Sequence, residues 1–154
     1  TPAGPARGPY PRPMPLESDE ALRELLAGCR SIAVVGIKAG ADDDAFQVPR
    51  HMQRAGWRIL PVNPKLREVL GEPCVPRLAD LRSPVDLVNV FRAAENVPAH
   101  VDEILALSPR PRAVWLQLGI RHDAAVARLE AAGIAVVQDR CLMVDQRRLG
   151  VGPT

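Results

Sequence analysis

The sequence is poor in aromatic residues and in lysine, and its charges nearly balance. Phenylalanine, tryptophan and tyrosine make up 3% of the 154 residues, so few side chains are available to stack on nucleic-acid bases. The net charge of +2 gives no strong attraction for a polyanion. Lys38 and Lys65 are the only lysines; the other basic residues are arginines, most of which we expect at the surface. These features argue against a nucleic-acid binder.

Long apolar runs and a paired set of cysteines are missing too. No run approaches the roughly eighteen apolar residues that a membrane span requires. The first residues hold no basic cluster followed by an apolar segment, so no secretory signal is expected. Cys29, Cys74 and Cys141 are odd in number and widely spaced, which argues against a disulfide framework and a zinc site. We therefore expect a cytoplasmic protein that contacts no membrane.

The N-terminal stretch, residues 1–16, is rich in proline and has almost nothing to bury. It is predicted to be a mobile tail, and the folded domain is predicted to span residues 17–150. That domain begins with a helix over 17–29, because Ser18 can cap it and apolar residues follow at helical spacing.

Beyond this helix, short apolar runs rich in β-branched residues alternate with helical segments. Runs this continuously apolar are typical of strands covered on both faces, as in a parallel sheet. The alternation predicts an α/β fold, a three-layer Rossmann-like domain with a mainly parallel sheet of about five strands. The predicted strands are 31–36, 57–63, 85–91, 112–118 and 134–139; the predicted helices are 46–55, 95–107 and 122–132; and residues 64–84 are expected to form a turn or a short irregular helix.

The loops after the strands are where such a domain binds its ligand, near the switch point of the strand order. The loop after the first strand fits a dinucleotide-binding motif only in part, because Gly36 and Ala41 occupy the first and third glycine positions but Lys38 occupies the second. The second strand ends in Asn63, Pro64 and Lys65, without the acidic residue that holds the ribose of NAD. Both observations favour a nucleotide held in another way.

Three aspartates, Asp42 to Asp44, interrupt this first loop. Asp44 and Gln47 match a capping box, and acidic residues suit the first turn of a helix. Because Pro49 is comfortable only in a first turn, the regular helix is expected to begin near Val48. In either arrangement the aspartates would compete with an anionic ligand for the same backbone N–H groups.

As a whole, residues 18–149 resemble the small CoA-binding-domain proteins, single-domain relatives of the nucleotide-binding domain of the succinyl-CoA synthetase α subunit. The resemblance rests on "SIAVVGI" (31–37), "GWRILPVNP" (56–64), "LGEPCVPRLADL" (70–81), "PVDLVNVFR" (84–92), "AVWLQLGI" (113–120) and "DRCLMVDQRRL" (139–149). It implies a Rossmann-like fold that binds coenzyme A at the carboxyl ends of the strands, with no catalytic activity general to the family. Family members often have a Ser-Arg-Pro-like run where this chain has its aspartates.

The resemblance also implies roles for particular residues. Backbone groups of the first loop would line the phosphates, the ends of the second and third strands would border the adenosine, and the end of the fourth would face the diphosphate or the pantetheine arm. These residues are Gly36, Ile37 and Lys38; Asn63, Pro64 and Lys65, with Phe91, Arg92 and Val97; and Gln117, Leu118 and Gly119.

Catalytic or metal chemistry has little support in the sequence. Cys141 follows the fifth strand and could be a reactive thiol that forms a mixed disulfide with the coenzyme, but a structural cysteine explains it as well. The three histidines are never at metal-ligand spacing; His51 and His100 are expected on helix surfaces, and His122 near the strand ends could touch a ligand. Trp57 and Trp115 are expected in the core.

We therefore expect a module that binds coenzyme A or an acyl-CoA, without catalytic residues or a metal. Two alternatives stay open: an NAD(P)-binding oxidoreductase-like protein, and a CoA-responsive regulatory or scaffolding protein. A homodimer is a reasonable expectation for a small domain.

Overall fold

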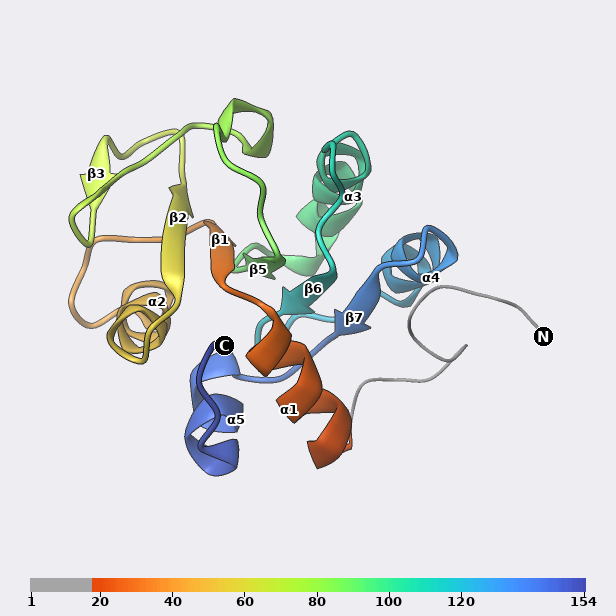
Figure 1. Cartoon of the computed structure of the whole chain (residues 1–154). Coiled ribbons are helices and arrows are strands. Elements are labelled where there is room, and N and C mark those ends of the chain that lie inside the picture. Colours follow the sequence, from red (N-terminus) through yellow and green to blue (C-terminus); the bar gives the residue numbers. More distant parts are fainter. Residues whose placement is uncertain (1–17) are drawn as a thin grey trace.

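Five parallel strands form the central sheet, in the order β2-β1-β5-β6-β7 (Figure 1). The computed structural model describes residues 18–154, so the tail predicted for residues 1–16 lies outside the described residues. The α/β architecture and the five-strand sheet predicted from the sequence are confirmed. The strands are β1 (Ser31–Val35), β2 (Arg58–Val62), β5 (Leu87–Val90), β6 (Ala113–Leu116) and β7 (Ala135–Val137).

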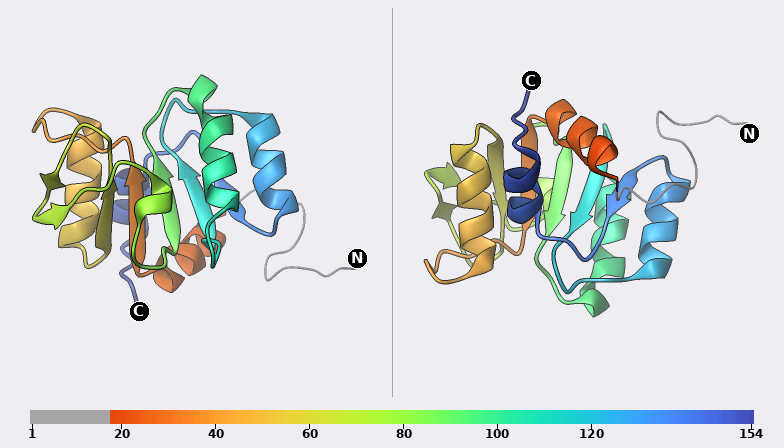
Figure 2. Two further views of the ribbon diagram at one scale, coloured as in Figure 1. Left: turned by 90° about the horizontal axis from the view of Figure 1, so that it is seen from above. Right: turned by 90° about the horizontal axis from the view of Figure 1, so that it is seen from below.

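Helices cover both faces of this sheet, as Figure 2 shows from two sides. On one face lie α1 (Asp19–Gly28), α2 (Asp44–Arg54) and α5 (Leu142–Leu149), and on the other lie α3 (Val97–Leu105) and α4 (Asp123–Ala131). Each face has its own core of buried apolar side chains. This is why the strands are continuously apolar: neither face of β1, β5 or β6 meets solvent.

Two tryptophans anchor the face covered by α1, α2 and α5, as expected from the sequence. Trp57 and Trp115 are 1% and 0% exposed. Their indole N–H groups donate to backbone oxygens, that of Trp57 to Cys29 at 2.9 Å and that of Trp115 to Arg140 at 2.8 Å. Burial of the rings is therefore achieved without an unpaired indole donor.

Helix α2 begins at Asp44, so the expectation that it would begin near Val48 is wrong. Pro49 lies inside the helix, where it cannot donate to the oxygen of Ala45 four residues earlier. The backbone N–H of Lys38 donates to that oxygen instead, at 3.2 Å. A loop residue thus supplies the hydrogen bond that the proline removes, and the first loop is tied to the helix.

The segment 64–84 has more structure than the predicted turn or short irregular helix. It holds a small antiparallel pair, β3 (Glu68–Val69) with β4 (Glu72–Pro73), followed by a 3-10 helix, η1 (Leu78–Asp80). A second 3-10 helix, η2 (Ala94–Asn96), leads into α3. Helix α5 was not predicted as a helix, because its sequence, LMVDQRRL, offers only a short apolar stripe among charged residues.

Candidate functional site at the carboxyl ends of the strands

The switch point of the sheet lies between β1 and β5, where the chain has turned from one side of β1 to the other. Gly36 follows β1 at this point with φ of +85°, and the N–H of Phe91 donates to the oxygen of Val35 at 2.8 Å. A Cβ on Gly36 would lie 2.5 Å from the carbonyl oxygen of Phe91. Glycine is therefore required here both by its backbone conformation and by the approach of the neighbouring strand.

Asn63, directly after β2, joins the first two loops. Its Nδ2 donates to the oxygen of Ile37 at 2.7 Å, and its Oδ1 accepts from the N–H of Lys65 at 2.7 Å. The N–H of Gly36 donates to Val62 in the same region, at 3.0 Å. The side chain predicted to border a nucleotide thus holds the two loops that would enclose it.

The backbone donors predicted for phosphate are partly used within the chain. Gly36 and Lys38 donate to Val62 and Ala45, whereas the N–H of Ile37 has no acceptor among residues 18–154. Ile37 is 0% exposed, however, so its N–H is buried within the loop and is not open to a ligand.

Three cations follow three neighbouring strands at this edge. Lys38 and Lys65, the only lysines of the chain, are exposed after β1 and β2, and Arg92 is half-buried after β5. The Cδ of Arg92 lies 3.0 Å from the position that a Cβ on Gly36 would take, so this side chain passes over the switch point. Arg92 is therefore placed to contact an anion at the carboxyl ends of β1 and β5.

The aspartates of the first loop do not form the expected capping box. Asp43, not Asp44, is the N-cap of α2, and its side chain makes no capping hydrogen bond. One Asp43 carboxylate oxygen instead lies 2.9 Å from the position of a Cβ on Gly40, over the loop. Gln47 reaches back to the oxygen of Ala41, to which its Nε2 donates at 2.8 Å. Asp43 therefore places a negative charge on the loop that an anion would approach.

At the end of β6, Gln117 and Gly119 are held by the loop after β7. Gln117 is 5% exposed, and its Oε1 accepts from the N–H of Leu142 at 3.4 Å. The N–H of Gly119 donates to Asp139 Oδ1 at 2.7 Å. Between them Leu118 points outward and is 66% exposed, a large apolar side chain open to solvent beside the site.

Asn89, inside β5, was not predicted as part of this region. It is fully buried, and its Nδ2 donates to the oxygen of Trp115 at 3.2 Å and to Gln117 Oε1 at 3.3 Å. Its Oδ1 is the only buried side-chain oxygen or nitrogen without a partner among the described residues. The sequence signal was a single amide in the apolar strand "VDLVNVF". Asn89 thus holds the Gln117 side chain through a hydrogen bond, while its own Oδ1 accepts none.

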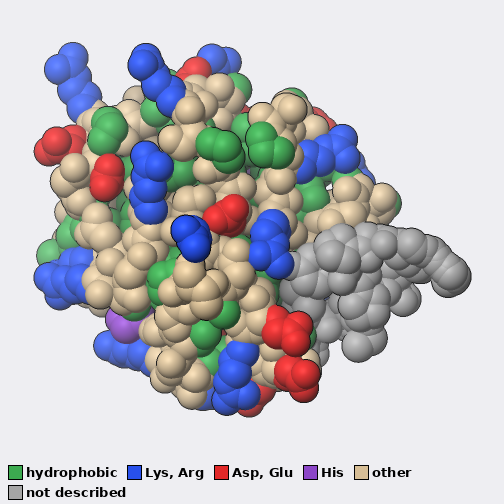
Figure 3. Space-filling model, in the orientation of Figure 1, with side chains coloured by type: hydrophobic (Ala, Val, Ile, Leu, Met, Phe, Trp, Pro, Cys, Tyr) green, Lys and Arg blue, Asp and Glu red, His purple; other side chains and the backbone are tan. Residues whose placement is uncertain are grey.

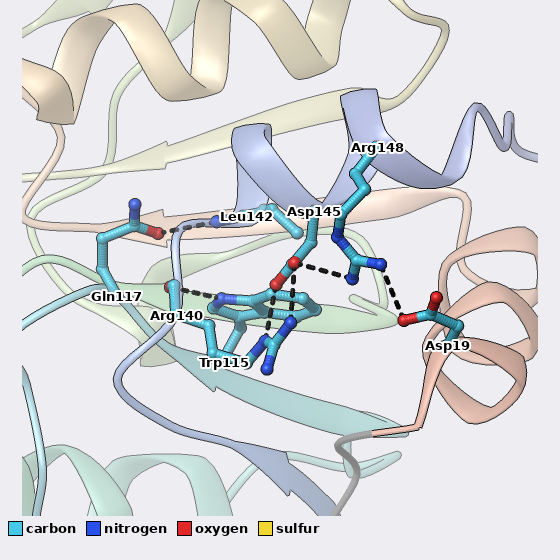
Figure 4. A network of polar contacts seen from close by, with 7 residues as sticks. All are labelled: Asp19, Trp115, Gln117, Arg140, Leu142, Asp145 and Arg148. Carbon is cyan, nitrogen blue, oxygen red and sulfur yellow. Dashed lines mark hydrogen bonds and ion pairs between the residues drawn. The ribbon is translucent and has the colours of Figure 1, made fainter.

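A buried carboxylate fixes the loop between β7 and α5 (Figure 4). Asp145 is 4% exposed and accepts two hydrogen bonds from Arg140, at 2.7 and 2.8 Å, and one from Arg148 at 3.1 Å. Arg148 also pairs with Asp19 of α1 at 2.7 Å. Burial acts to raise the pKa of the Asp145 carboxyl, but the hydrogen bonds from the two arginines outweigh it, so the pKa lies below its usual value.

The remaining candidates are placed as follows. Val97, the first residue of α3, is 1% exposed, so its side chain offers no surface to a ligand. Cys141 is the half-buried N-cap residue of α5. His122 caps α4, where its Nδ1 accepts from the N–H of Ala125 at 3.1 Å. His51 and His100 lie on helices α2 and α3, as expected, but they are half-buried and bonded to Gln146 and Glu103, at 2.6 and 2.8 Å.

Neither metal ligation nor a membrane span is found in the described part of the chain. Residues 18–154 contain no group of three or more His, Cys, Asp or Glu arranged to hold a metal ion. None of the helices over the same residues is long and apolar enough to cross a bilayer.

Comparison with known proteins decides the family. The model of the family described as "CoA binding domain" matches residues 30–147. The chain belongs to the CoA-binding domain family. The resemblance inferred from the sequence is therefore confirmed, and the matched range includes every strand of the sheet and all the loops described above.

Relatives of this CoA-binding domain include short proteins of the same size. The uncharacterized protein YneT of Bacillus subtilis is 36% identical over 123 residues, which are 80% of this chain and 90% of YneT. The solved structure of cell-free ID.343 from Thermus thermophilus is 44% identical, with a TM-score of 0.82, and the match covers 86% of this chain and 99% of that one.

One relative with an assigned activity is much longer. The ADP-forming acetate–CoA ligase I of Archaeoglobus fulgidus is 31% identical over 72 residues, which are 47% of this chain but 10% of the ligase. The CoA-binding domain described here thus resembles a small part of that enzyme.

Proposed function

We propose that this CoA-binding domain binds coenzyme A or an acyl-CoA at the carboxyl ends of β1, β2, β5 and β6, without catalysing a reaction. The family match supports a CoA-related ligand. The observation that carries the proposal is the switch point itself, where Gly36 lets the first loop approach the Phe91 carbonyl closely and the Arg92 side chain lies beside it. Ligands of open parallel sheets bind at this place.

The residues divide by the part of the ligand that they would meet. Lys38 and Arg92 would contact the phosphates, and Lys65 with Pro64 and Phe91 would border the adenosine. Leu118 would lie against the pantetheine arm. Its side chain is 66% exposed, and burying apolar surface against the arm would favour binding. In this proposal Gly36, Asn63, Gln117 and Gly119 shape the crevice, and Val97 supports it from the core.

The alternative of NAD binding is disfavoured by the end of β2. NAD binders hold the ribose there with a carboxylate, whereas this chain has Asn63, whose side chain is hydrogen-bonded to Ile37 and Lys65. We also propose that the protein acts in the cytoplasm and forms a homodimer, and that a CoA-dependent partner contact is the form any regulatory role would take. A partner in such a contact would bind near exposed Leu118, beside the crevice, where bound coenzyme A changes the exposed surface.

Replacing Arg92 with alanine should weaken coenzyme A binding by about 1.5 to 3 kcal/mol, because a charge-assisted hydrogen bond to a phosphate is lost. Calorimetric titration measures the change. Arg82→Ala is the matched control, since Arg82 is exposed in the segment before β5, at the opposite end of the sheet. Equal affinity of both variants for coenzyme A would remove Arg92 from the site.

Replacing Asp43 with arginine should strengthen coenzyme A binding roughly three- to tenfold at low salt, because a charge over the first loop changes from repelling phosphate to attracting it. The gain should shrink as salt is added. Glu24→Arg makes the same charge change on the exposed face of α1 and should have little effect. If Asp43→Arg binds no better than Glu24→Arg, the loop does not meet the phosphates.

A further inference from the structure

A basic groove lies between α2 and α5, on the face of the sheet that these helices share. Its volume is about 200 Å³. Figure 3 shows basic side chains beside a histidine at the lower left of the molecule, where α2 and α5 lie in Figure 1. The groove is lined by Gln47, Arg50, His51, Arg54, Met143 and Arg147.

Helical spacing places these residues on facing sides of the two helices. The four from α2 follow one another at intervals of three, one and three residues, and the two from α5 are four residues apart, so each set forms one stripe. The helices are joined across the groove by His51 Nε2 and Gln146 Oε1, 2.6 Å apart. Gln146 Nε2 donates to the oxygen of Val151, so the His51 ring nitrogen is the donor in this bond.

The positive charge of the groove is not neutralised by the protein. No carboxylate lines it, and Arg50, Arg54 and Arg147 take part in none of the ion pairs found within residues 18–154. The next residue, Arg148, is different because it pairs with both Asp19 and Asp145 on the other side of α5.

One of the groove arginines is also held in place. The guanidinium carbon of Arg50 lies 5.4 Å from the centre of the Phe46 ring, over its face. A cation that is already positioned loses less conformational freedom when it binds an anion. The groove therefore combines three unneutralised guanidinium groups, one of them oriented, around a cavity large enough for a small anion.

We propose that this groove binds a phosphoryl group of a small ligand. Guanidinium groups bind phosphate oxygens in pairs, and convergence of three from two helices favours a multiply charged anion over a monocarboxylate. Met143 and the arms of the arginines form its apolar wall. The inference does not depend on coenzyme A binding at the strand ends, because its residues are not those of the crevice.

Pyrophosphate is the probe for this site, used with the whole chain and followed by calorimetry and by backbone amide chemical shifts. We expect saturable binding with the largest shifts at residues 50–54 and 143–147. Arg50→Gln and Arg147→Gln should each weaken it at least tenfold, whereas Arg82→Gln, an exposed arginine of another cavity, should leave it unchanged. Thermal unfolding of each variant checks that its fold is intact.

The proposal is overturned if pyrophosphate shows no saturable shifts in the groove up to about 10 mM. It is also overturned if Arg50→Gln and Arg147→Gln bind pyrophosphate as the unchanged protein does, or if the shifts fall only on the loop after β1.

Two sources of the phosphoryl group are separated by repeating the titration in saturating coenzyme A. If a separate phosphorylated molecule occupies the groove, pyrophosphate binds the CoA-saturated protein and Arg50→Gln leaves coenzyme A affinity unchanged. If a phosphate of the coenzyme itself reaches the groove, coenzyme A displaces pyrophosphate and Arg50→Gln weakens coenzyme A binding. Weaker coenzyme A binding in Arg92→Ala with unchanged pyrophosphate binding keeps the groove and the crevice distinct.

Discussion

Replacing Gly36 with alanine should lower the free energy of unfolding by about 2 to 4 kcal/mol and abolish coenzyme A binding. The methyl group adds the cost of a left-handed backbone conformation to that of a clash with the Phe91 carbonyl, 2.5 Å away. That carbonyl belongs to the backbone after β5 and can move only if the switch point opens. Denaturant unfolding and calorimetric titration of the same sample measure both effects.

Gly133→Ala separates these two costs. Gly133 has φ of +83°, close to the +85° of Gly36, but nothing lies within 4 Å of a Cβ placed there. Its substitution should therefore cost only the conformational part, about 1 to 2 kcal/mol, and leave coenzyme A binding intact. If Gly36→Ala is no more destabilising than Gly133→Ala, the close approach of Phe91 does not constrain the site.

Replacing Asp145 with asparagine should lower the free energy of unfolding by about 2 to 3 kcal/mol at neutral pH. The change keeps the shape of the side chain but leaves Arg140 without the carboxylate that accepts two of its hydrogen bonds. Asp102→Asn, which removes an exposed carboxylate paired with Arg128, is the control and should have a much smaller effect.

The effect of Asp145→Asn should depend on pH in one direction. Because hydrogen bonds from Arg140 and Arg148 hold the folded-state pKa of Asp145 below its unfolded value, the ionised carboxylate adds stability that is fully present above the unfolded value of about 4. That contribution is lost as the pH falls through the folded-state pKa. The gap between the unchanged protein and Asp145→Asn should therefore narrow on acidification below about pH 4. A gap that stays constant or widens would contradict the assigned role of the carboxylate.

The sheet was predictable because its strands are buried on both faces. Continuous apolar runs such as "SIAVV" mark parallel strands, and their order along the chain fixes which loops meet at one edge. Strand order alone therefore predicts that one edge of the sheet holds Gly36, Asn63, Arg92 and Gln117. The hydrogen bonds that join their loops are consistent with that arrangement.

What could not be predicted depends on contacts between distant residues. Pro49 seemed to exclude an earlier start of α2, but the Lys38 N–H, eleven positions earlier in the chain, fills the place of its missing donor. The capping box of Asp44 and Gln47 was predicted from a local pattern, but Gln47 donates its hydrogen bond to the Ala41 oxygen instead. Helix α5 is held by the pairing of Asp145 with Arg140 and Arg148. The spacing of apolar residues along the sequence gives no sign of these ion pairs.

Calorimetric titration of the purified protein with coenzyme A, NAD and ATP tests the central claim most directly. The proposed crevice predicts saturable binding of coenzyme A at one site per chain, with NAD and ATP weaker or silent, and loss of that binding in Gly36→Ala but not in Gly133→Ala. Binding of NAD with coenzyme A silent would contradict the proposed function.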